Sequence, residues 1–212
     1  LPRTSYDECV DWICNLLDEA ASSLPAIRTN KEDYGLATSV GAKAVKAKML
    51  LYAASPLFNG NSSFYSNFTD KSGSQLMPLT YDPNKWVKAK TAIKEAIDLA
   101  EQNGHALYVK QDYKIGNEDA NPYPAAGPVR CLRTSLVDWD SRNPEVLLAE
   151  TRSEGSYGIQ NKSLPFVTDG WAWNGVGPTW TMLNRFYTKN GLPWDEDPEY
   201  KDKDKLKIVN VD

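Results

Sequence analysis

The sequence predicts a mainly α protein in which helical hairpins are followed by a loop-rich region containing short strands. In the first half, apolar residues recur at spacings of three and four in three separate stretches, which is the period of an amphipathic helix. Two of these stretches are rich in alanine, and small residues let neighbouring helices approach closely. After about residue 107, prolines, glycines and short apolar runs replace this period. We therefore expect a helical-repeat scaffold over residues 1–110 and a loop-rich region with short strands and one helix over residues 111–212.

The first helix is expected to begin after Ser5 and to end before Pro25. Ser5 and Glu8 have the spacing of a capping box, in which each side chain binds a free backbone amide of the first turn. An apolar stripe follows at spacings of three and four, made of Cys9, Ile13, Leu16, Leu17, Ala20 and Leu24. Trp12 lies beside this stripe, so we expect it to pack in the core.

The second helix is expected to span residues 39–54 and to lie between two neighbours. One face carries Val40, Ala44, Ala47, Leu51 and Ala54, and Gly41, Ala42 and Ala53 keep its sides thin. Such small side chains permit close packing on two sides. Lys43, Lys46 and Lys48 are expected to mark the face exposed to solvent. Residues 57–81, after Pro56, form a connection of a length that is typical of binding loops or disordered insertions.

The third helix is expected to begin at Asp82-Pro83 and to end at Asn103-Gly104. Aspartate is a good N-cap, proline suits the first helical position, and glycine accepts the left-handed conformation that ends a helix. One face carries Trp86, Ala89, Ile93, Ala96, Ile97 and Ala100, so Trp86 is also expected in the core. This helix and the preceding one read as an antiparallel hairpin of a helical repeat.

The second half gives weaker signals. Residues 144–149 (PEVLLA) are a candidate for a short buried strand, and residues 179–188 show a helical period that includes Trp180 and stops at Asn190-Gly191. We expect Trp180 to be a core residue. The tail over residues 195–207 alternates in charge, and no closing element follows it, so we expect the protein to continue into a further C-terminal part.

Composition excludes several classes of function. The chain of 212 residues is 41% hydrophobic and has a net charge of −4, which is not the basic surface of a nucleic-acid-binding protein. A single histidine excludes zinc sites with two imidazoles. Cys9, Cys14 and Cys131 are expected to be free, buried thiols, because their spacing suits neither a disulfide nor a metal site. No apolar run is long enough to cross a bilayer.

Nothing in the sequence indicates an enzyme, a metal site or a bound cofactor. His105 follows the end of a helix without a serine or cysteine nucleophile motif, so we expect a surface or packing role for it. Phosphate-binding glycine motifs are missing from the sequence. A glycoside hydrolase would need two converging carboxylates, for which Asp138, Asp140, Glu145 and Glu150 are the candidates. We regard that reading as the weaker alternative.

Aromatic residues favour a ligand-binding function instead. Five of the seven tryptophans lie in the second half, namely Trp139, Trp171, Trp173, Trp180 and Trp194. A sugar ring has an apolar face and a rim of hydroxyls, so flat aromatic rings beside polar side chains suit it. The candidate ligand-binding residues are Trp171, Trp173, Asn174, Trp139 and Tyr157. Core packing is the alternative for Trp171 and Trp173.

One long motif resembles a known family. Residues 35–60 (GLATSVGAKAVKAKMLLYAASPLFNG) are similar to the signature helix of the SusD/RagB family, the glycan- and nutrient-binding outer-membrane lipoproteins of Bacteroidetes. Further similarities follow in the family's order, at residues 81–86 (YDPNKW), 143–146 (NPEV), 178–179 (PT) and 186–193 (FYTKNGLP). The resemblance spans most of residues 5–195.

This resemblance implies a tetratricopeptide-like helical scaffold and a non-catalytic receptor for oligosaccharides or other nutrients, starch in some members. It implies a surface-exposed location in the outer membrane through a lipid anchor that is absent from this chain. It also implies delivery of the ligand to a SusC-like TonB-dependent transporter. In starch-binding members part of an aromatic arc lies near the positions of Trp171 and Trp173. The alternative is a tetratricopeptide-type adaptor that binds peptides on a concave helical face.

Overall fold

The computed structural model describes residues 3–109, 127–137, 143–151, 159–163, 173 and 175–201. The chain forms two compact units, residues 1–151 and 152–212. In the described residues the secondary structure is helical, with α1 (Tyr6–Ser23), α2 (Ser39–Ala54), α3 (Ser62–Tyr65), α4 (Asn84–Gln102), α5 (Pro128–Val137), α6 (Ile159–Ser163), α7 (Trp180–Leu183) and the short 3-10 helix η1 (Lys31–Asp33). The mainly α class is confirmed, whereas the proposed division at residue 110 stays a prediction.

Helix α1 begins at the predicted capping box. The Ser5 hydroxyl accepts a hydrogen bond from the Glu8 backbone N–H, and the Glu8 carboxylate accepts one from the Ser5 N–H at 3.2 Å. The hydrogen bonds from the Ser5 hydroxyl and N–H hold the pKa of the Glu8 carboxyl below its usual value. Leu24 takes an extended conformation before Pro25 and ends the helix, because a residue that precedes proline is disfavoured in a helix.

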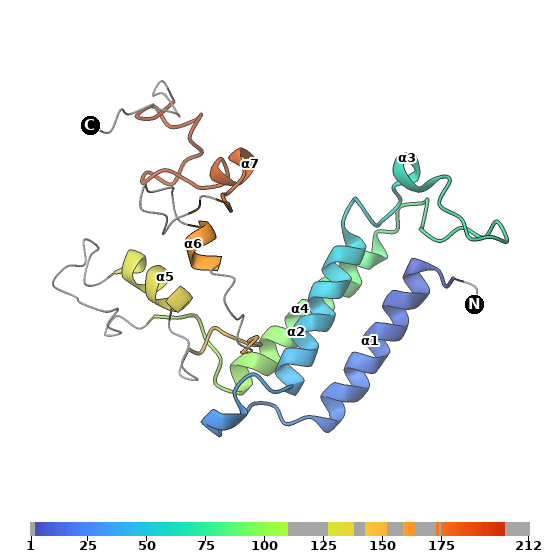
Figure 1. Ribbon diagram of the computed structural model, residues 1–212, viewed down its shortest axis with the longest axis horizontal. Coiled ribbons are helices and arrows are strands. Elements are labelled where there is room, and N and C mark those ends of the chain that lie inside the picture. Colours follow the sequence, from blue (N-terminus) through green and yellow to red (C-terminus); the bar gives the residue numbers. More distant parts are fainter. Residues whose placement is uncertain are drawn as a thin grey trace. The chain divides into compact units, whose positions relative to one another are not determined.

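Helix α2 is the central helix of unit 1 and packs against both α1 and α4 (Figure 1). Toward α1, Val10 and Cys14 meet Ala53, with Met49 and Leu50 beside them. Toward α4, Ala47 meets Ala92 and Ala96, again with Leu50 at the contact. Leu50 therefore belongs to both clusters, and the prediction of an inner helix between two neighbours agrees with this packing.

The contact between α2 and α4 is an alanine seam. On α4 the buried residues are Ala89, Ala92, Ala96 and Ala100, at spacings of three and four. On α2 they include Val40, Ala47 and Ala54. Ala47, Ala92 and Ala96 form the buried centre of this contact, with Leu50 and Ile93 packed beside them. Because these alanines carry only methyl groups, the two backbones can approach closely there.

The corner between α2 and α4 is held by Asn59, which is almost fully buried. Its side-chain amide donates to the carbonyl oxygens of Asp82 at 2.9 Å and Ala54 at 3.4 Å, and its carbonyl oxygen accepts from the Asp82 N–H at 2.9 Å. Gly60 follows with φ +82°, and a Cβ there would come within 2.4 Å of the Tyr81 nitrogen. Asn59 and Gly60 therefore close this end of the hairpin, at the end of the signature motif.

Two lysines of α2 do not mark the solvent-facing side, contrary to the prediction. Lys43 and Lys46 both bind the Asp18 carboxylate of α1, at 2.7 and 2.5 Å. Their ammonium groups lie at the edge of the α1–α2 contact, where a shared carboxylate neutralises part of their charge. Lys48 is exposed as predicted. Helical period alone could not distinguish a solvent-facing lysine from one that bridges two helices.

The tryptophans of the helices are surface residues, so the prediction that they pack in the core is wrong. Trp12 is 64% exposed and Trp86 41% exposed. Neither ring belongs to the buried clusters that join α2 to α1 and α4. The cysteines are free, as predicted, but only Cys14 is buried, while Cys9 and Cys131 are partly exposed.

The segment over residues 57–81 is an ordered cover for the hairpin's closed end. It contains α3 and one isolated antiparallel bridge between Thr69 and Gln75. The Tyr6 N–H donates to the Leu76 carbonyl at 2.8 Å, and the Tyr6 ring stacks on Phe58 with centroids 5.2 Å apart. These contacts tie the segment to the start of α1, so it is a packed part of unit 1.

Two predictions for the later chain are corrected. Residues 144–149 do not form a strand, because the described residues offer them no partner strand. Pro144 instead accepts a single backbone hydrogen bond, from Ala106 at 3.2 Å. The helix expected over residues 179–188 is only the four residues of α7. Helix α5, which begins with proline in the first helical position, had not been predicted.

In unit 2, residues 188–201 are organised around the buried carboxylate of Asp197. This carboxylate accepts hydrogen bonds from the Thr188 hydroxyl, from the Asn190 amide at 3.0 Å and from the Glu199 N–H at 2.8 Å. The Thr188 hydrogen bond is the main reason that the pKa of Asp197 is lowered. Trp194 packs against Tyr200 beside this turn, with ring centroids 5.3 Å apart.

Candidate functional site

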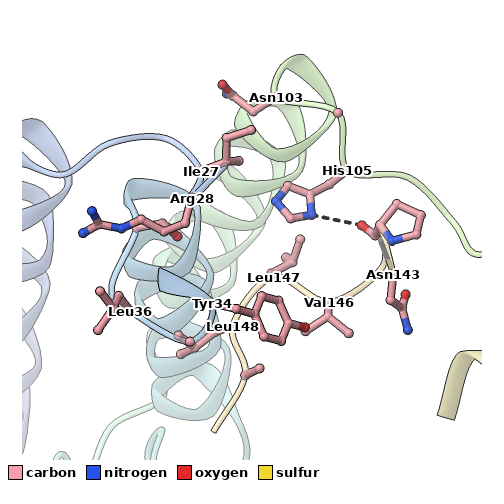
Figure 2. A pocket seen from close by; sticks show the side chains of 15 residues that line it. Ile27, Arg28, Tyr34, Leu36, Asn103, His105, Asn143, Val146, Leu147 and Leu148 are labelled. Carbon is pink, nitrogen blue, oxygen red and sulfur yellow. Dashed lines mark hydrogen bonds between the residues drawn. The ribbon is translucent and has the colours of Figure 1, made fainter. Parts of the chain in front are cut away.

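The candidate site in unit 1 is a hollow of about 250 Å³ at the end of the hairpin opposite Asn59 (Figure 2). Three segments form it: the linker between α1 and α2, the end of α4, and residues 143–149. The lining residues are Ile27, Arg28, Tyr34, Gly35, Leu36, Thr38, Asn103, Gly104, His105, Asn143, Pro144, Val146, Leu147, Leu148 and Ala149. None of them is acidic, so the hollow combines apolar side chains with neutral and cationic groups.

The end of α4 places His105 at the hollow. Gly104 has φ +88°, the left-handed conformation predicted for it. The N–H groups of Gly104 and His105 donate to the carbonyls of Glu101 and Ala100, at 3.2 and 3.0 Å. These are the two hydrogen bonds of a Schellman motif, which satisfies the last carbonyls of the helix. The motif turns the chain sharply, so that His105 comes directly after the helix end.

His105 is fixed by the backbone of the segment that follows α5. Its Nδ1 lies 2.9 Å from the carbonyl oxygen of Pro144. A carbonyl can only accept, so Nδ1 carries the hydrogen, and in the neutral imidazole Nε2 is then an acceptor. Figure 2 shows Nε2 turned away from Pro144, toward Ile27 and Arg28. The hollow therefore receives a hydrogen-bond acceptor whose orientation is set by the protein.

Arg28 also lines the hollow, and Figure 2 shows its guanidinium directed away from His105. Its Nε and Nη2 donate to the carbonyl of Ala37, at 3.3 and 3.0 Å. This pair of hydrogen bonds fixes the guanidinium plane and leaves Nη1 for another acceptor. Asn103 uses its amide nitrogen to cap the Leu99 carbonyl at 2.7 Å, which leaves its carbonyl oxygen as a further acceptor.

Apolar side chains supply the remaining wall. Leu147 and Val146 are partly buried, whereas Leu36 and Leu148 are about half exposed. Leu147 and Leu148 pass close to the first turn of α2, where a Cβ on Gly41 would lie 3.5 Å from the Leu148 Cδ1 atom. The absence of a side chain at Gly41 therefore lets residues 147 and 148 approach α2, which brings this wall against the helix.

Sequence reasoning did not assign this hollow. His105 was expected only to be a surface or packing residue, and Arg28 and Tyr34 were not singled out. The available signal was local: a helix stop at Asn103-Gly104 followed at once by the chain's single histidine. What completes the site is the segment 143–149, which lies about forty residues further along the chain.

Of the ligand-binding residues predicted from sequence, Trp173 is the one that the structure describes. Trp139, Tyr157, Trp171 and Asn174 lie outside the described residues, so their roles stay predictions. Trp173 is 48% exposed, and its backbone N–H donates to the backbone carbonyl of Asn161 in α6 at 2.8 Å. The N–H groups of Gly175 and Val176 both donate to the Lys162 carbonyl, at 2.8 and 2.9 Å. Three backbone hydrogen bonds therefore tie this tryptophan segment to α6.

Unit 2 presents further aromatic side chains at its surface. Trp180 is 43% exposed, which corrects the prediction of a core residue, and Phe186 and Tyr187 are 64% and 70% exposed. The helical period over residues 179–188 therefore does not bury an apolar stripe in unit 2. These rings offer flat apolar area of the kind that stacks on a sugar face.

The described residues contain no group of three or more histidine, cysteine or acidic side chains placed to hold a metal ion. No helix within the described ranges has the length and apolarity to cross a membrane.

Comparison with known proteins identifies one family. A profile described as the SusD family matches residues 144–212. The solved structure of BT4246 has 34% sequence identity and a TM-score of 0.70, covering 93% of this chain and 36% of its own. Its selenomethionine form gives 33% identity and a TM-score of 0.68 over the same shares.

No curated protein matches the chain. The chain spans 36% of the length of the solved relatives, that is, about a third. The family profile covers the later part of the chain, and the structural similarity covers nearly all of it. Together with the signature motif over residues 35–60, these matches show that the chain belongs to the SusD/RagB family.

Proposed function

We propose that the protein binds an oligosaccharide or related nutrient at the cell surface, without transforming it, and passes it to a TonB-dependent transporter of the outer membrane. The observation that carries this proposal is membership of the SusD/RagB family. Binding proteins of this kind need a rigid scaffold and a surface of aromatic and polar groups. The α1–α2–α4 packing supports the first requirement. For the second, unit 2 by itself has exposed aromatic rings, and unit 1 by itself has the hollow at the end of α4.

A pair of tryptophan variants tests the binding function. Trp173→Ala removes an exposed ring of unit 2, whereas Trp12→Ala removes an exposed ring of α1 that lies outside both candidate sites. Binding of a panel of neutral oligosaccharides is measured by calorimetry, and the same mixtures are analysed for hydrolysis products. We expect Trp173→Ala to weaken binding by about 1–3 kcal/mol, the usual range for a stacked aromatic contact, and Trp12→Ala to leave it unchanged.

Two results would contradict the proposal, and a third would remove Trp173 from the binding site. Release of shorter saccharides would indicate a glycoside hydrolase. Failure of the intact protein to bind any member of the panel would remove the saccharide ligand. Equal affinity of the native protein and Trp173→Ala, with a lower melting temperature of the variant, would assign Trp173 to packing and leave binding to other residues.

Delivery to a transporter and anchoring by lipid are the finer parts of the proposal. We expect the protein, tagged and purified in mild detergent from its native host, to carry a TonB-dependent transporter that mass spectrometry identifies. We expect metabolic labelling with palmitate to mark the protein in the outer-membrane fraction. Recovery in the soluble fraction, without label and without a transporter, would contradict both parts.

The peptide-adaptor alternative has one supporting feature. A groove of about 490 Å³ runs between α1 and α4 over α2, and it carries charges of both signs from Asp11, Lys46, Lys88 and Glu95. Lys88 and Asp11 lie 3.9 Å apart across it. This alternative would be favoured if peptides of mixed charge compete with one another for binding to the protein while added saccharides do not displace them.

A further inference from the structure

We propose that the second half of α1, residues 15–23, is a movable arm beside the groove between α1 and α4, and that an ion-pair clamp holds this arm closed. The clamp consists of Asp18 on α1 and of Lys43 and Lys46 on α2, whose ammonium groups lie 2.7 and 2.5 Å from the carboxylate. The inference goes beyond the proposed function and does not depend on saccharide binding, because the groove shares no lining residue with the hollow at the end of α4.

Burial anchors only the first half of α1. Val10 and Cys14 are the buried residues of this helix, and both pack with Ala53 of α2. One turn before Val10, the Tyr6 ring stacks on Phe58 with centroids 5.2 Å apart. After Cys14, no residue of this fully described helix is buried. Apolar contacts therefore fix the beginning of α1, whereas its end is held by weaker packing and by charge.

The side of α1 that faces α4 is not close-packed. The described helix packing joins α1 to α2 and α2 to α4, but it does not join α1 to α4. A groove of about 490 Å³ lies between them, and Cys14 and Asn15 line it on the α1 side. Asp11 and Lys88 face each other across the groove at 3.9 Å, and both are exposed. The arm can therefore move on this side without disrupting a packed apolar contact.

The charges of the two helices are complementary. Helix α2 carries three lysines and no acidic residue, whereas α1 carries no basic residue and five acidic ones, Asp7, Glu8, Asp11, Asp18 and Glu19. In the clamp, the side chains of Lys43 and Lys46 are less exposed than the Asp18 carboxylate that joins them. Without this carboxylate, two partly buried ammonium groups would repel each other beside the arm.

The clamp makes closure of the arm sensitive to ionic strength. Salt screens charges over a Debye length of about 30 Å at 0.01 M and about 3 Å at 1 M. Val10 and Cys14 are held by burial, which salt does not weaken in this way. High salt therefore releases residues 15–23 and leaves the Tyr6 end in place. Release widens the groove beside Cys14 and frees the ammonium groups of Lys43 and Lys46.

Cys14 can report this opening, because it is buried in the closed form and lines the groove. Burial raises the pKa of its thiol, so the reactive thiolate is scarce while the arm is closed. The intact protein is treated with iodoacetamide, an uncharged thiol reagent, at about 0.01 M and about 1 M sodium chloride. Mass spectrometry of peptides then gives the labelling rate of each cysteine.

We expect the labelling rate of Cys14 to rise about three- to tenfold with salt, which is the effect of losing one partly exposed ion-pair cluster. Cys9 lies near the anchored end of α1, and Cys131 lies in α5, so their rates should change little. These two thiols are partly exposed and serve as internal references for the reagent.

A matched pair of variants isolates the clamp. Asp18→Asn keeps the shape of the side chain but removes its charge, so we expect rapid labelling of Cys14 already at low salt and little further change at high salt. Asp98→Asn removes an exposed carboxylate that pairs with Lys94 inside α4. This control should label as the native protein does, at both salt concentrations.

Hydrogen exchange of the native protein gives a second measurement that needs no variant. We expect the amides of residues 15–23 to exchange faster at high salt, while the amides of α2 and α4 stay protected. Equal salt dependence in all three helices would overturn the movable arm.

The labelling outcomes decide the proposal in the same way. A rise confined to Cys14, and lost in Asp18→Asn, supports the clamp. A Cys14 rate that does not depend on salt, or a native rate in Asp18→Asn, would overturn it. Parallel increases at Cys9, Cys14 and Cys131 would indicate general loosening of unit 1 and would also overturn it. None of these results bears on saccharide binding, so the proposed function is tested separately.

Discussion

The two ends of the α2–α4 hairpin differ in how tightly side chains fill them. At one end, Asn59 and Gly60 fill the corner completely, with three side-chain hydrogen bonds and no room for another methyl group. At the other end, Gly104 and His105 leave open space beside a polar atom that a ligand could use. The buried Asn59 amide is a folding element because its hydrogen bonds hold the corner, whereas His105 uses only Nδ1 on the residues that the structure describes.

A pair of glycine variants gives the largest expected contrast between the two ends. Gly60 and Gly104 both have positive φ, +82° and +88°, so alanine is strained at either position. At Gly60, the new Cβ would also lie within 2.4 Å of the Tyr81 nitrogen, whereas at Gly104 nothing lies within 4 Å. We expect Gly60→Ala to lower the free energy of unfolding by about 3–4 kcal/mol and Gly104→Ala by about 1 kcal/mol. Urea unfolding followed by circular dichroism measures the free energy of unfolding of both variants. Equal losses would contradict the conclusion that the hairpin is closed at Gly60 and open at Gly104.

The two asparagines offer a second, smaller contrast. Asn59→Ala removes three hydrogen bonds and leaves the backbone N–H and carbonyl of Asp82 without these partners. Asn103→Ala removes a single hydrogen bond to the Leu99 carbonyl. We expect losses of about 2–3 and about 0.5–1 kcal/mol, because an unsatisfied buried group costs more than an exposed hydrogen bond contributes. A cost at Asn103 that matches the cost at Asn59 in the same unfolding assay would show that the open end is also a folding element.

The smallest expected effect concerns pH and the ion pairs between α1 and α2. Burial raises the pKa of the Asp18 carboxyl, but the hydrogen bonds from Lys43 and Lys46 outweigh it and leave the pKa below its ordinary value of 3.8. A lowered folded-state pKa means that this contribution is present above about pH 4 and is lost as the pH falls through the folded value.

We expect Asp18→Asn to lower the free energy of unfolding at pH 7 by less than about 1 kcal/mol, because the carboxylate is partly exposed. Once the pH is below the folded-state pKa of Asp18, the variant and the native protein should be equally stable. Asp98→Asn, which removes an exposed carboxylate paired with Lys94 within α4, is the matched control. A stability deficit of Asp18→Asn that does not shrink as the pH is lowered would show that the side chain acts through packing.

Local signals in the sequence predicted the helices of unit 1 well. The capping box at Ser5, the span of α2 and the stop at Gly104 each depend on residues within one turn of one another, and each is found in the structure. Such patterns can be read from the sequence because a helix cap or a left-handed glycine depends only on neighbouring residues and needs no distant partner.

Contacts between segments were not predictable in this way. Asn59 closes the corner only because Asp82 returns to it, and His105 lines a hollow only because residues 143–149 pass beside it. The exposure of Trp12 and Trp86 was missed for a related reason: a helical period shows that a stripe exists, but not which neighbours cover it. Local sequence patterns therefore could not predict the candidate site, although they did predict the helix end that precedes His105.

The small residues between α2 and α4 leave this contact little tolerance for change. Ala47, Ala92 and Ala96 form its buried centre, so only methyl groups separate the two backbones there. A larger side chain at Ala92 or Ala96 would push α4 away from α2. Because His105 directly follows the end of α4, such a change in the interior would also move this part of the lining of the hollow.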